Sequence, residues 1–368
     1  MYETGTVRYC GVPAKGGISM KGSKLRFGVL GIGRIGKIHI ENLVNRIPGA
    51  EVVAVCDVAA AELETVAARF GIGRTFGDYR ELMDLPEVDA VAICSPTNLH
   101  YQMIVDAAAR GKQIFCEKPI DLSIEKVQAA NEEVSRRGVR MMVGFNRRFD
   151  PNFLKVRETI AGGLVGQPHV LRITSRDPGP PPEQYIRASG GIFLDMTIHD
   201  FDMARYLMGS EVTEVYTRAA VLVDPMIGKA GDWDTAVITL TFENGAFAMI
   251  DNSRKAVYGY DQRVEMFGSE GMVTVTNNTP DTHILCDRVG IHTALPLNFF
   301  LERYTESYLR EMRAFVDAVQ NQTPVPVGGE DGLKAMVIAL AAGKSARENR
   351  PVKLAEIYEG VIPTCHVS

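Results

Sequence analysis

The sequence predicts an α/β fold in two parts: a doubly wound parallel sheet, then an α+β domain with a large, mostly antiparallel open sheet. Up to about residue 146, short apolar runs alternate with helical patterns, as in parallel strands with helices on both faces. From about residue 151, several runs alternate polar and apolar residues, as in an antiparallel sheet with one covered face. We expect a flexible extension at 1–24, a first domain at 25–146 and a second at 147–368.

The composition is that of an ordinary soluble globular protein. Its 368 residues are 46% hydrophobic and 23% charged, which is enough chain for two substantial cores. A formal net charge of −5 without basic runs argues against a nucleic-acid partner. No apolar run approaches the roughly 18 residues of a membrane helix, and the first residues carry no export signal. Six cysteines without a C-x-x-C pair fit a reducing compartment, so we expect a cytoplasmic protein.

The first domain opens on a glycine-rich turn. Strand Leu25–Leu30 leads into Gly31-Ile-Gly33-Arg-Ile-Gly36, and a helical pattern follows. In this strand–turn–helix context, G-x-G-x-x-G predicts a Rossmann-type dinucleotide site, because glycines permit the turn and the close approach of a pyrophosphate. The free N–H groups of the helix N-terminus then face that phosphate.

Asp57 stands at the end of the second strand, Glu51–Cys56, 21 residues after Gly36. A carboxylate there accepts hydrogen bonds from the adenosine ribose and repels a 2′-phosphate. The sequence therefore predicts NAD rather than NADP.

The alternation continues to residue 146. The expected helices are Ala59–Phe70, Tyr79–Leu85, Tyr101–Arg110 and 123–137, and the expected strands are Thr75–Phe76, Ala90–Cys94, Gln113–Cys116 and Met141–Phe145. Ligands of such sheets bind beyond the carboxyl ends of the strands. The predicted cofactor-binding residues are Gly31, Gly33, Arg34, Ile35, Gly36, Asp57, Ser95, Thr97, Asn98, His100, Glu117 and Lys118.

The second domain is predicted from longer runs. A helix at Asn152–Ala161 precedes strands at 169–175, 212–223, 234–243, 246–253, 262–267 and 272–276. Turns at 243–245 and 269–271 predict hairpins. Helices Tyr304–Gln320 and Gly332–Glu348 and a short strand Val352–Leu354 close the chain, and the proline-rich segment Asp177–Glu183 suits the wall of a site.

A polar stripe is predicted on a helix within Ser189–Tyr206. Asp195, His199, Asp202 and Tyr206 are spaced i, i+4, i+7 and i+11. A carboxylate one turn from a histidine can hold the imidazole and help to place a substrate hydroxyl. The alternatives are a solvated helix face and a metal pair, and the second lacks further ligands nearby, so we predict no metal.

Three motifs resemble one known family. Gly31–Gly36, Glu117-Lys118-Pro119 and Gly190-Gly-x-x-x-Asp195-x-x-x-His199 occur in the order of the glucose–fructose oxidoreductase and inositol dehydrogenase family (Gfo/Idh/MocA). The resemblance covers about residues 25–354. Within it, Phe145–Asp150, the Gly190–Arg205 helix and Tyr258–Arg263 are most similar to inositol 2-dehydrogenases.

The resemblance implies roles for particular residues. Lys118 matches the catalytic lysine, His199 the proton acceptor and Asp195 the acidic partner that positions the substrate. The positions that match the lining of the polyol pocket are Arg147, Asp177 and Tyr260, and Asn146 and Ser175 stand where some members have methionine and histidine. The implied reaction is NAD-dependent oxidation of a cyclic polyol, with myo-inositol giving 2-keto-myo-inositol (scyllo-inosose). The implied assembly is a homodimer or homotetramer through the open sheet of the second domain.

Three other functions remain open. The substrate could be another inositol isomer, a pyranose or an anhydrosugar, because hydroxyl-binding pockets use similar residue types. An NAD-dependent glycosidase of the same fold is a second alternative. A redox-silent NAD(H) sensor is the third, although it has no need for Lys118, Asp195 and His199 together.

Overall fold

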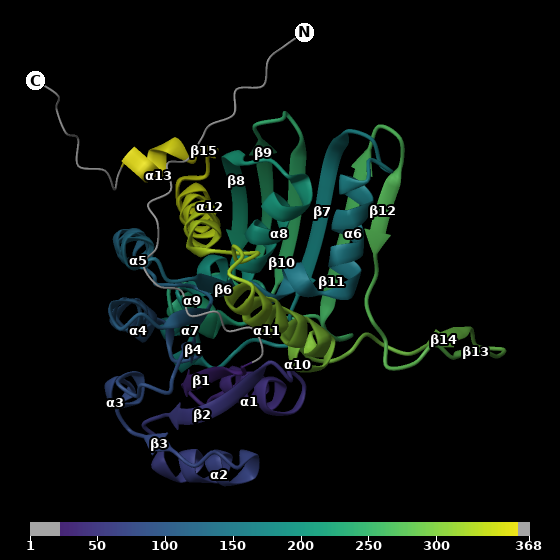
Figure 1. Ribbon diagram of the computed structural model, residues 1–368. Coiled ribbons are helices and arrows are strands. Elements are labelled where there is room, and N and C mark those ends of the chain that lie inside the picture. Colours follow the sequence, from purple (N-terminus) through teal and green to yellow (C-terminus); the bar gives the residue numbers. More distant parts are fainter. Residues whose placement is uncertain (1–22, 360–368) are drawn as a thin grey trace, which may run out of the picture.

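The computed structural model describes residues 23–359, so residues 1–22 of the predicted extension lie outside the described part. The first sheet has six parallel strands in the order β3-β2-β1-β4-β5-β6 (Figure 1). They are β1 (Leu25–Leu30), β2 (Ala50–Cys56), β3 (Thr75–Phe76), β4 (Ala90–Ile93), β5 (Gln113–Glu117) and β6 (Met141–Gly144). Their helices are α1 (Arg34–Asn45), α2 (Ala60–Phe70), α3 (Tyr79–Met83), α4 (Thr97–Ala109) and α5 (Ile124–Arg137). The central strands are buried almost throughout, which is why their sequences are continuous apolar runs.

The second sheet has seven strands in the order β12-β11-β7-β10-β9-β8-β15. They are β7 (Pro168–Arg176), β8 (Val212–Ala220), β9 (Thr235–Phe242), β10 (Phe247–Ser253), β11 (Asp261–Gly268), β12 (Met272–Val275) and β15 (Val352–Lys353). Neighbours are antiparallel except β7 and β10, which run parallel. The fold class predicted from the sequence is therefore confirmed.

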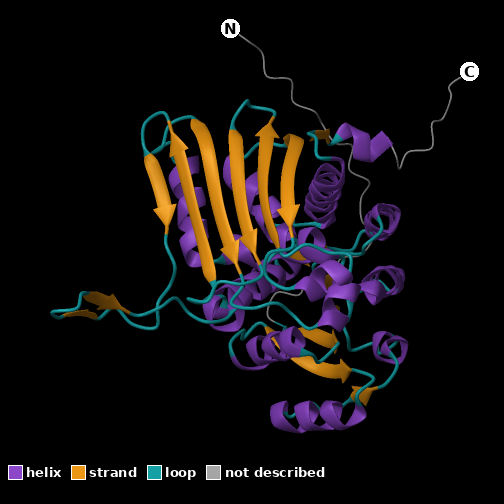
Figure 2. Ribbon diagram, turned by 180° about the vertical axis from the view of Figure 1, so that it is seen from behind, coloured by secondary structure: helices purple, strands orange, loops and turns teal. Residues whose placement is uncertain are grey.

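Within residues 23–359, helices cover one face of the second sheet only. They are α6 (Pro151–Ala161), α8 (Ile198–Met208) and α12 (Gly329–Glu348). Figure 2 shows the other face with no helix in front of it. Along β9 the side chains alternate between buried and more exposed, so the sheet has a core face and an open face.

One long helix of the second half crosses back to the first sheet. Helix α11 (Thr305–Gln320) places the Phe315 ring 6.0 Å from Phe27 and 5.9 Å from Phe115. At its end, Gln320 Nε2 donates to the carbonyl of Gly49 at 2.9 Å. Residues that the sequence division assigns to the second domain thus complete the core of the first.

The predicted helix within Ser189–Tyr206 is wrong as one continuous element. Helix α7 (Glu183–Ser189) ends before Gly190 and Gly191, whose φ angles are +86° and +80°. A widened π-helical turn, η2 (Phe193–Thr197), then leads into α8. Because such a turn holds an extra residue, it breaks the predicted stripe.

Several short elements escaped prediction because they have too few residues to show a period. They are the 3₁₀ turn η1 (Asn146–Phe149), α7, α9 (Pro225–Lys229), β13 (Ile284–Cys286), β14 (Ile291–Thr293), α10 (Phe300–Arg303) and α13 (Ala355–Glu359). Strand β8 also ends at Ala220 rather than 223. None of the described helices is long and apolar enough to cross a bilayer.

Candidate active site

The glycine turn after β1 is shaped for close contacts. Gly31 has a φ of +91°, and a Cβ there would lie 2.7 Å from the main chain of Cys94. A Cβ on Gly36 would lie 2.0 Å from the carbonyl oxygen of Gly31, so this glycine lets α1 approach the turn. A Cβ on Gly33 would meet no described atom within 4 Å, which leaves space for a ligand at the helix N-terminus.

Asp57 is tied to the same turn. Its Oδ2 accepts from the N–H of Ile32 at 2.9 Å and its Oδ1 from the N–H of Ala59 at 3.0 Å. Each oxygen keeps a further lone pair, so the carboxylate can still accept from a ribose hydroxyl.

A second helix begins beside the glycine turn. β1 and β4 are neighbours where the strand order reverses, and crevices of doubly wound sheets form at this point. Helix α4 starts at Thr97, four residues earlier than predicted, so Thr97 and Asn98 lie in its first turn near the crevice. Ser95 precedes it, and its Oγ lies 3.3 Å from the sulfur of Met103.

His100 is buried inside this region. Its Nδ1 lies 2.8 Å from the carbonyl oxygen of Pro119, and its Nε2 lies 2.8 Å from that of Ser95. Both ring nitrogens therefore contact the main chain. The position holds two strand ends together and leaves no free ring nitrogen for a cofactor.

Two further cofactor candidates differ in their surroundings. The guanidinium of Arg34 lies 5.5 Å from the ring centre of Phe299 and 5.9 Å from that of Phe300. Ile35 packs against the hydrophobic core. The side chain of Arg34 thus links the glycine turn to a segment far along the chain.

Lys118 follows β5 and reaches the widened turn η2. Its Nζ donates to the main-chain oxygen of Asp195 at 2.8 Å and lies 3.4 Å from Asp195 Oδ1. Both side chains are mostly buried, with 15% and 11% of their surface exposed. A contact between side chains of the two halves is thereby shielded from bulk water.

Two residues that sequence reasoning missed complete the surroundings of Asp195. Tyr185 on α7 donates its hydroxyl to Asp195 Oδ1 at 2.9 Å, and Arg254 Nη1 donates to Oδ2 at 3.1 Å. Burial favours a higher pKa for Asp195, but Lys118 and Arg254 outweigh it and the pKa lies below its ordinary value. Arg254 directly follows β10, and its position at a strand end is the only signal in the sequence.

His199 on α8 is held as a neutral imidazole. Burial, together with the charges of Lys118 and Arg147, lowers its pKa well below the ordinary value. The Phe145 ring lies edge-on at 6.0 Å. Nδ1 is buried and has no hydrogen-bond partner among residues 23–359. Asp195 bonds Lys118, Tyr185 and Arg254, so the expected support of the imidazole by this carboxylate is not what the structure shows.

The other members of the predicted stripe lie elsewhere. Asp202 bonds Arg148 Nε at 2.8 Å, and the Arg148 guanidinium lies 5.1 Å from the Tyr206 ring centre. These contacts join α8 to η1. Asp202 and Tyr206 are therefore scaffold rather than part of the site.

Arg147 anchors a buried polar network beside His199. Its Nη1 donates to Asp200 Oδ1 at 2.5 Å and its Nη2 to Ser175 Oγ at 3.3 Å. Its guanidinium lies 5.7 Å from the ring centre of Tyr304, and Tyr260 packs edge-on against that ring at 6.0 Å. The network brings Arg147 and Tyr260 together, as the resemblance implies.

Asn146 is buried beside Arg147 in the chain. Its main-chain oxygen accepts from the hydroxyl of Ser307, while its side-chain Nδ2 has no partner among the described residues. A buried amide donor without a partner is costly, so a ligand oxygen would be favoured there.

Asp177 lies beside the same centre. Its Oδ2 is 3.8 Å from Arg254 Nη1. Burial raises its pKa to about 6, with Arg254 opposing the shift. The charge of this side chain therefore changes just below neutral pH.

Comparison with known proteins agrees with this geometry. Residues 25–145 match the model of an oxidoreductase family with an NAD-binding Rossmann fold, and residues 153–274 match the GFO/IDH/MocA C-terminal domain. The chain belongs to the GFO/IDH/MocA family. The family predicted from the three motifs is thus confirmed.

Relatives are similar over nearly their whole length. The chain is 51% identical to the myo-inositol 2-dehydrogenase of Thermotoga maritima, over 90% of this chain and 99% of the relative. It is 46% identical to the inositol 2-dehydrogenase of Rhizobium meliloti, again over 90% and 99%. A crystal structure of Lactobacillus casei scyllo-inositol dehydrogenase with bound NAD(H) and scyllo-inositol has a TM-score of 0.85 and 30% identity, covering 90% of this chain and 100% of that one.

In this GFO/IDH/MocA chain, a buried cluster of one histidine and two glutamates adjoins the Glu117–Lys118 segment. Glu117 Oε1 lies 2.8 Å from His39 Nε2, and Glu311 Oε1 lies 4.0 Å from the same nitrogen. These are the residue types that bind metals, and their ligand atoms lie within 4.8 Å of one another. Both Glu311 oxygens are buried without a partner among the described residues, and burial raises its pKa well above the ordinary value. A neutral Glu311 beside a His39–Glu117 hydrogen bond accounts for the cluster without an ion.

Replacing Glu311 with glutamine should make stability less dependent on pH. A raised folded-state pKa means that the stabilising contribution is present below the ordinary glutamate value and is lost as pH rises. The Glu311→Gln variant should therefore be more stable than the wild type at pH 8, and the difference should be smaller at pH 5. Urea unfolding at both pH values measures this. Glu306→Gln, on the exposed side of α11, is the control, and equal pH dependence in Glu311→Gln and wild type would contradict a neutral Glu311.

Proposed function

We propose that this protein is an NAD-dependent dehydrogenase that oxidises one secondary hydroxyl of myo-inositol to give 2-keto-myo-inositol. The observation that carries the proposal is the meeting of a lysine ammonium, a paired carboxylate and a neutral histidine at Lys118, Asp195 and His199. Oxidation of an alcohol needs a base for the hydroxyl proton and a positive group for the developing alkoxide.

The residues around the glycine turn fit NAD. The space at Gly33, the N-terminus of α1 and the Asp57 carboxylate supply what pyrophosphate and ribose require. When bound, the nicotinamide accepts the hydride. We assign the cofactor contacts to these groups and to the first turn of α4, and we leave His100 as a structural support.

Different residues of the chain have different roles at the reacting carbon. His199 takes the hydroxyl proton, because its pKa lies below neutral and its imidazole is neutral when the polyol arrives. Lys118 stabilises the oxygen as negative charge develops on it. Asp195 orients Lys118 through two of its oxygens, and together with Arg147, Asp177 and Tyr260 it offers hydrogen-bonding partners to the ring hydroxyls.

A substrate panel read by NADH absorbance tests the proposal. It should include myo-inositol, scyllo-inositol, D-chiro-inositol, glucose and an aryl glycoside. We expect NADH formation to be most efficient with myo-inositol, the substrate named for the relative of 51% identity, while the relative of 46% identity is named for inositol. Greater efficiency with scyllo-inositol or glucose would change the assigned substrate but leave the assigned reaction, NAD-dependent oxidation of a hydroxyl, unchanged. Release of the aryl group without net NADH would instead favour the glycosidase alternative.

Cofactor choice gives a second test. We expect kcat/KM with NAD⁺ to exceed that with NADP⁺ and the ratio to fall at least ~10-fold in Asp57→Asn, because a charge opposing the 2′-phosphate is removed. The N–H groups of Ile32 and Ala59 donate to different oxygens of Asp57, so asparagine keeps an acceptor for one of them. Asp84→Asn is the control, and an unchanged ratio in Asp57→Asn would rule out Asp57 as the selector.

The pKa of Asp177 predicts a change in substrate binding below neutral pH. The carboxylate forms above about pH 6, so KM for the polyol should fall as pH rises from 5 to 7. A lost hydrogen bond to a charged group costs about 1.5–3 kcal/mol, so Asp177→Asn should raise KM at pH 7 by ~10-fold or more and abolish the pH step. Steady-state KM at pH 5, 6 and 7 measures both effects. If the pH-dependent change in KM is the same in Asp177→Asn as in the wild type, another group causes it.

The open face of the second sheet supports an assembly of identical chains, as a homodimer or homotetramer. Its exposed side chains include Val237, Phe247 and Met249, each 41–55% accessible. Apolar rows of this kind usually mark a protein contact. A reducing compartment such as the cytoplasm fits the four unpaired cysteines among the described residues.

A further inference from the structure

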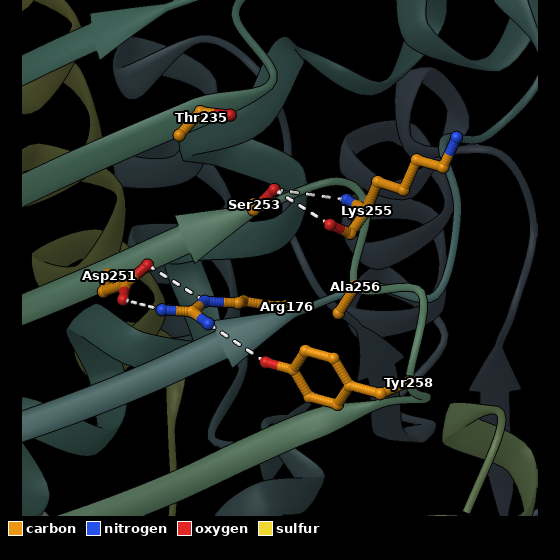
Figure 3. A pocket seen from close by; sticks show the side chains of 7 residues that line it. All are labelled: Arg176, Thr235, Asp251, Ser253, Lys255, Ala256 and Tyr258. Carbon is orange, nitrogen blue, oxygen red and sulfur yellow. Dashed lines mark hydrogen bonds and ion pairs between the residues drawn. The ribbon is translucent and has the colours of Figure 1, made fainter. Parts of the chain in front are cut away.

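Cavities outside the residues assigned to the polyol and the cofactor differ in whether their polar groups are paired. One cavity, of about 230 Å³, lies at the ends of β7 and β10 (Figure 3). Arg176 there donates to Asp251 and to the hydroxyl of Tyr258. The side chain of Lys255 points away from this group. No buried polar atom of this lining lacks a partner among residues 23–359, so a ligand would supply no missing hydrogen bond there.

A second cavity, of about 260 Å³, lies beside the widened turn η2. Its walls come from α7, from the segment 190–194, from residues 230–233 after α9 and from α12. None of these wall residues is assigned to the polyol or the cofactor. Sites for drug-sized ligands measure about 300–1,000 Å³, so this cavity suits a ligand with a single small ring.

Asp232 places a buried carboxylate in the wall of this second cavity. Its side chain is 8% exposed. Oδ1 accepts from the N–H of Ile192 at 3.0 Å, while Oδ2 is buried and has no hydrogen-bond partner among the described residues. Arg254 Nη2 lies 4.0 Å from Oδ2, which is beyond hydrogen-bonding distance. Because a buried acceptor without a donor is costly, a ligand hydroxyl would be favoured at this oxygen.

Two aromatic rings form another part of the wall. The ring centres of Phe193 and Trp233 lie 5.6 Å apart. A Cβ on Gly343 of α12 would lie 3.7 Å from the Phe193 ring and 3.4 Å from Arg347 Nη1, so a larger side chain would extend into the space between them. Aromatic faces offer a large apolar surface to a ligand, and the C–H side of a sugar or polyol ring is apolar enough to pack on them.

Arg347 adds a cation to the same cavity. It is exposed on α12, one turn after Gly343, and its guanidinium has no ion pair or hydrogen bond within residues 23–359. The other arginine of the lining, Arg187, donates twice to Glu183 Oε1. A guanidinium that is not already paired suits the planar oxygens of a carboxylate or the oxygens of a phosphate.

We propose that this second cavity is a further ligand site, for one small hydroxylated ring that bears a phosphate or a carboxylate. The ring packs on Phe193 and Trp233, a ring hydroxyl donates to Asp232 Oδ2, and the anionic group pairs with Arg347. The site goes beyond the proposed oxidation, because binding there needs neither the cofactor nor the polyol.

Asp232 also connects this site to the polyol site. Arg254, which lies 4.0 Å from Asp232, donates through Nη1 to Asp195 Oδ2 at 3.1 Å. Ile192, whose N–H Asp232 accepts, directly precedes η2, the turn that carries Asp195. A ligand bound to Asp232 therefore acts on both groups that hold Asp195 from this side. Control of turnover by that ligand is the consequence, and this consequence alone rests on the proposed function.

Calorimetry on the full-length protein without NAD⁺ tests binding with three probes: glucose 6-phosphate, glucuronate and, as the neutral comparison, glucose. Trp233 is the only tryptophan of the chain, so tryptophan fluorescence reports whether a probe lies in this cavity. Arg347→Gln removes the cation, and Gly343→Leu fills the space beside Phe193.

Each variant has a matched control. Arg69→Gln removes a 66% exposed guanidinium from α2 of the first domain. Gly343→Ala adds only a Cβ, which would make ordinary contacts. Because the Arg347 side chain is exposed, Arg347→Gln keeps the test decisive if leucine at position 343 disturbs α12.

We expect glucose 6-phosphate or glucuronate to bind once per chain and to change the fluorescence of Trp233, and the tighter probe identifies the anionic group. Kd should rise at least ~10-fold in Arg347→Gln, because a hydrogen bond between charged groups is lost. Binding should disappear in Gly343→Leu and persist in both controls.

Three results would overturn the site: no binding of either anionic probe, binding that leaves the tryptophan fluorescence unchanged, or glucose bound as tightly as the anions. Equal affinity in Arg347→Gln and wild type would also overturn it. Since none of these measurements involves turnover, failure here is distinct from failure of the proposed dehydrogenase reaction.

Discussion

Replacing His199 with alanine should lower kcat for polyol oxidation by at least ~10²-fold, the usual scale for a lost acid–base group. Affinity for NAD⁺ should stay nearly unchanged, because His199 lies on α8, away from the glycine turn. In the wild type, kcat should fall only in acid, below the ordinary range of histidine, while the change in KM near pH 6 belongs to Asp177. The sign follows from the pKa: the neutral base exists above it, and burial with Lys118 and Arg147 lowers it.

Two measurements on the folded His199→Ala variant decide whether His199 is the base: NAD⁺ titration and steady-state oxidation. His169→Ala is a matched control, since that histidine lies on β7 with its ring against Phe267. Near-normal turnover in His199→Ala with intact NAD⁺ binding would show that the proton leaves by another group.

Replacing Lys118 with methionine should cost at least ~10²-fold in kcat, because an oriented positive group at the developing alkoxide is removed. The pH dependence should change as well. Lys118 is one of the charges that lower the pKa of His199, so the acid limb of the residual activity should move to higher pH. The pKa of Asp195 should also rise, since Lys118 is one of the two cations that lower it.

Lys118→Arg is the matched control for charge. It should keep the acid limb near its wild-type position and still lose rate, because a planar guanidinium cannot reproduce the contacts of the ammonium with two oxygens of Asp195. A methionine variant with an unmoved acid limb would show that Lys118 and His199 are not electrostatically coupled in the working enzyme.

The cofactor half of the site was predictable because its chemistry depends on local sequence. In a turn that the strand–turn–helix motif already specifies, close main-chain contacts require Gly31 and Gly36, and Gly33 leaves space at the helix N-terminus. The position of Asp57 could be predicted because it comes directly after the second strand, at the usual distance from the glycine turn. His100 was assigned to the cofactor by its place after β4, and the structure instead shows its ring between two carbonyl oxygens.

The polyol half was predictable only through the family resemblance. Arg254, directly after β10, and Tyr185 on α7 reach Asp195 from 59 and 10 residues away in the chain. No local pattern connects such positions, because tertiary packing alone brings them together. For the same reason the sequence could not show that Glu311 of α11 lies behind Glu117.

The widened turn η2 makes the length of its segment as important as its composition. An α-helix advances about 100° per residue, so deleting one residue between Gly191 and His199 would let an ordinary helix form and swing one motif residue around the axis. Every side chain of the centre would still be encoded, yet Asp195 and His199 could no longer both keep their present places relative to Lys118. For anyone transplanting this centre into another scaffold, the spacing must be copied along with the residues, and a single gap here is a more serious change than most substitutions.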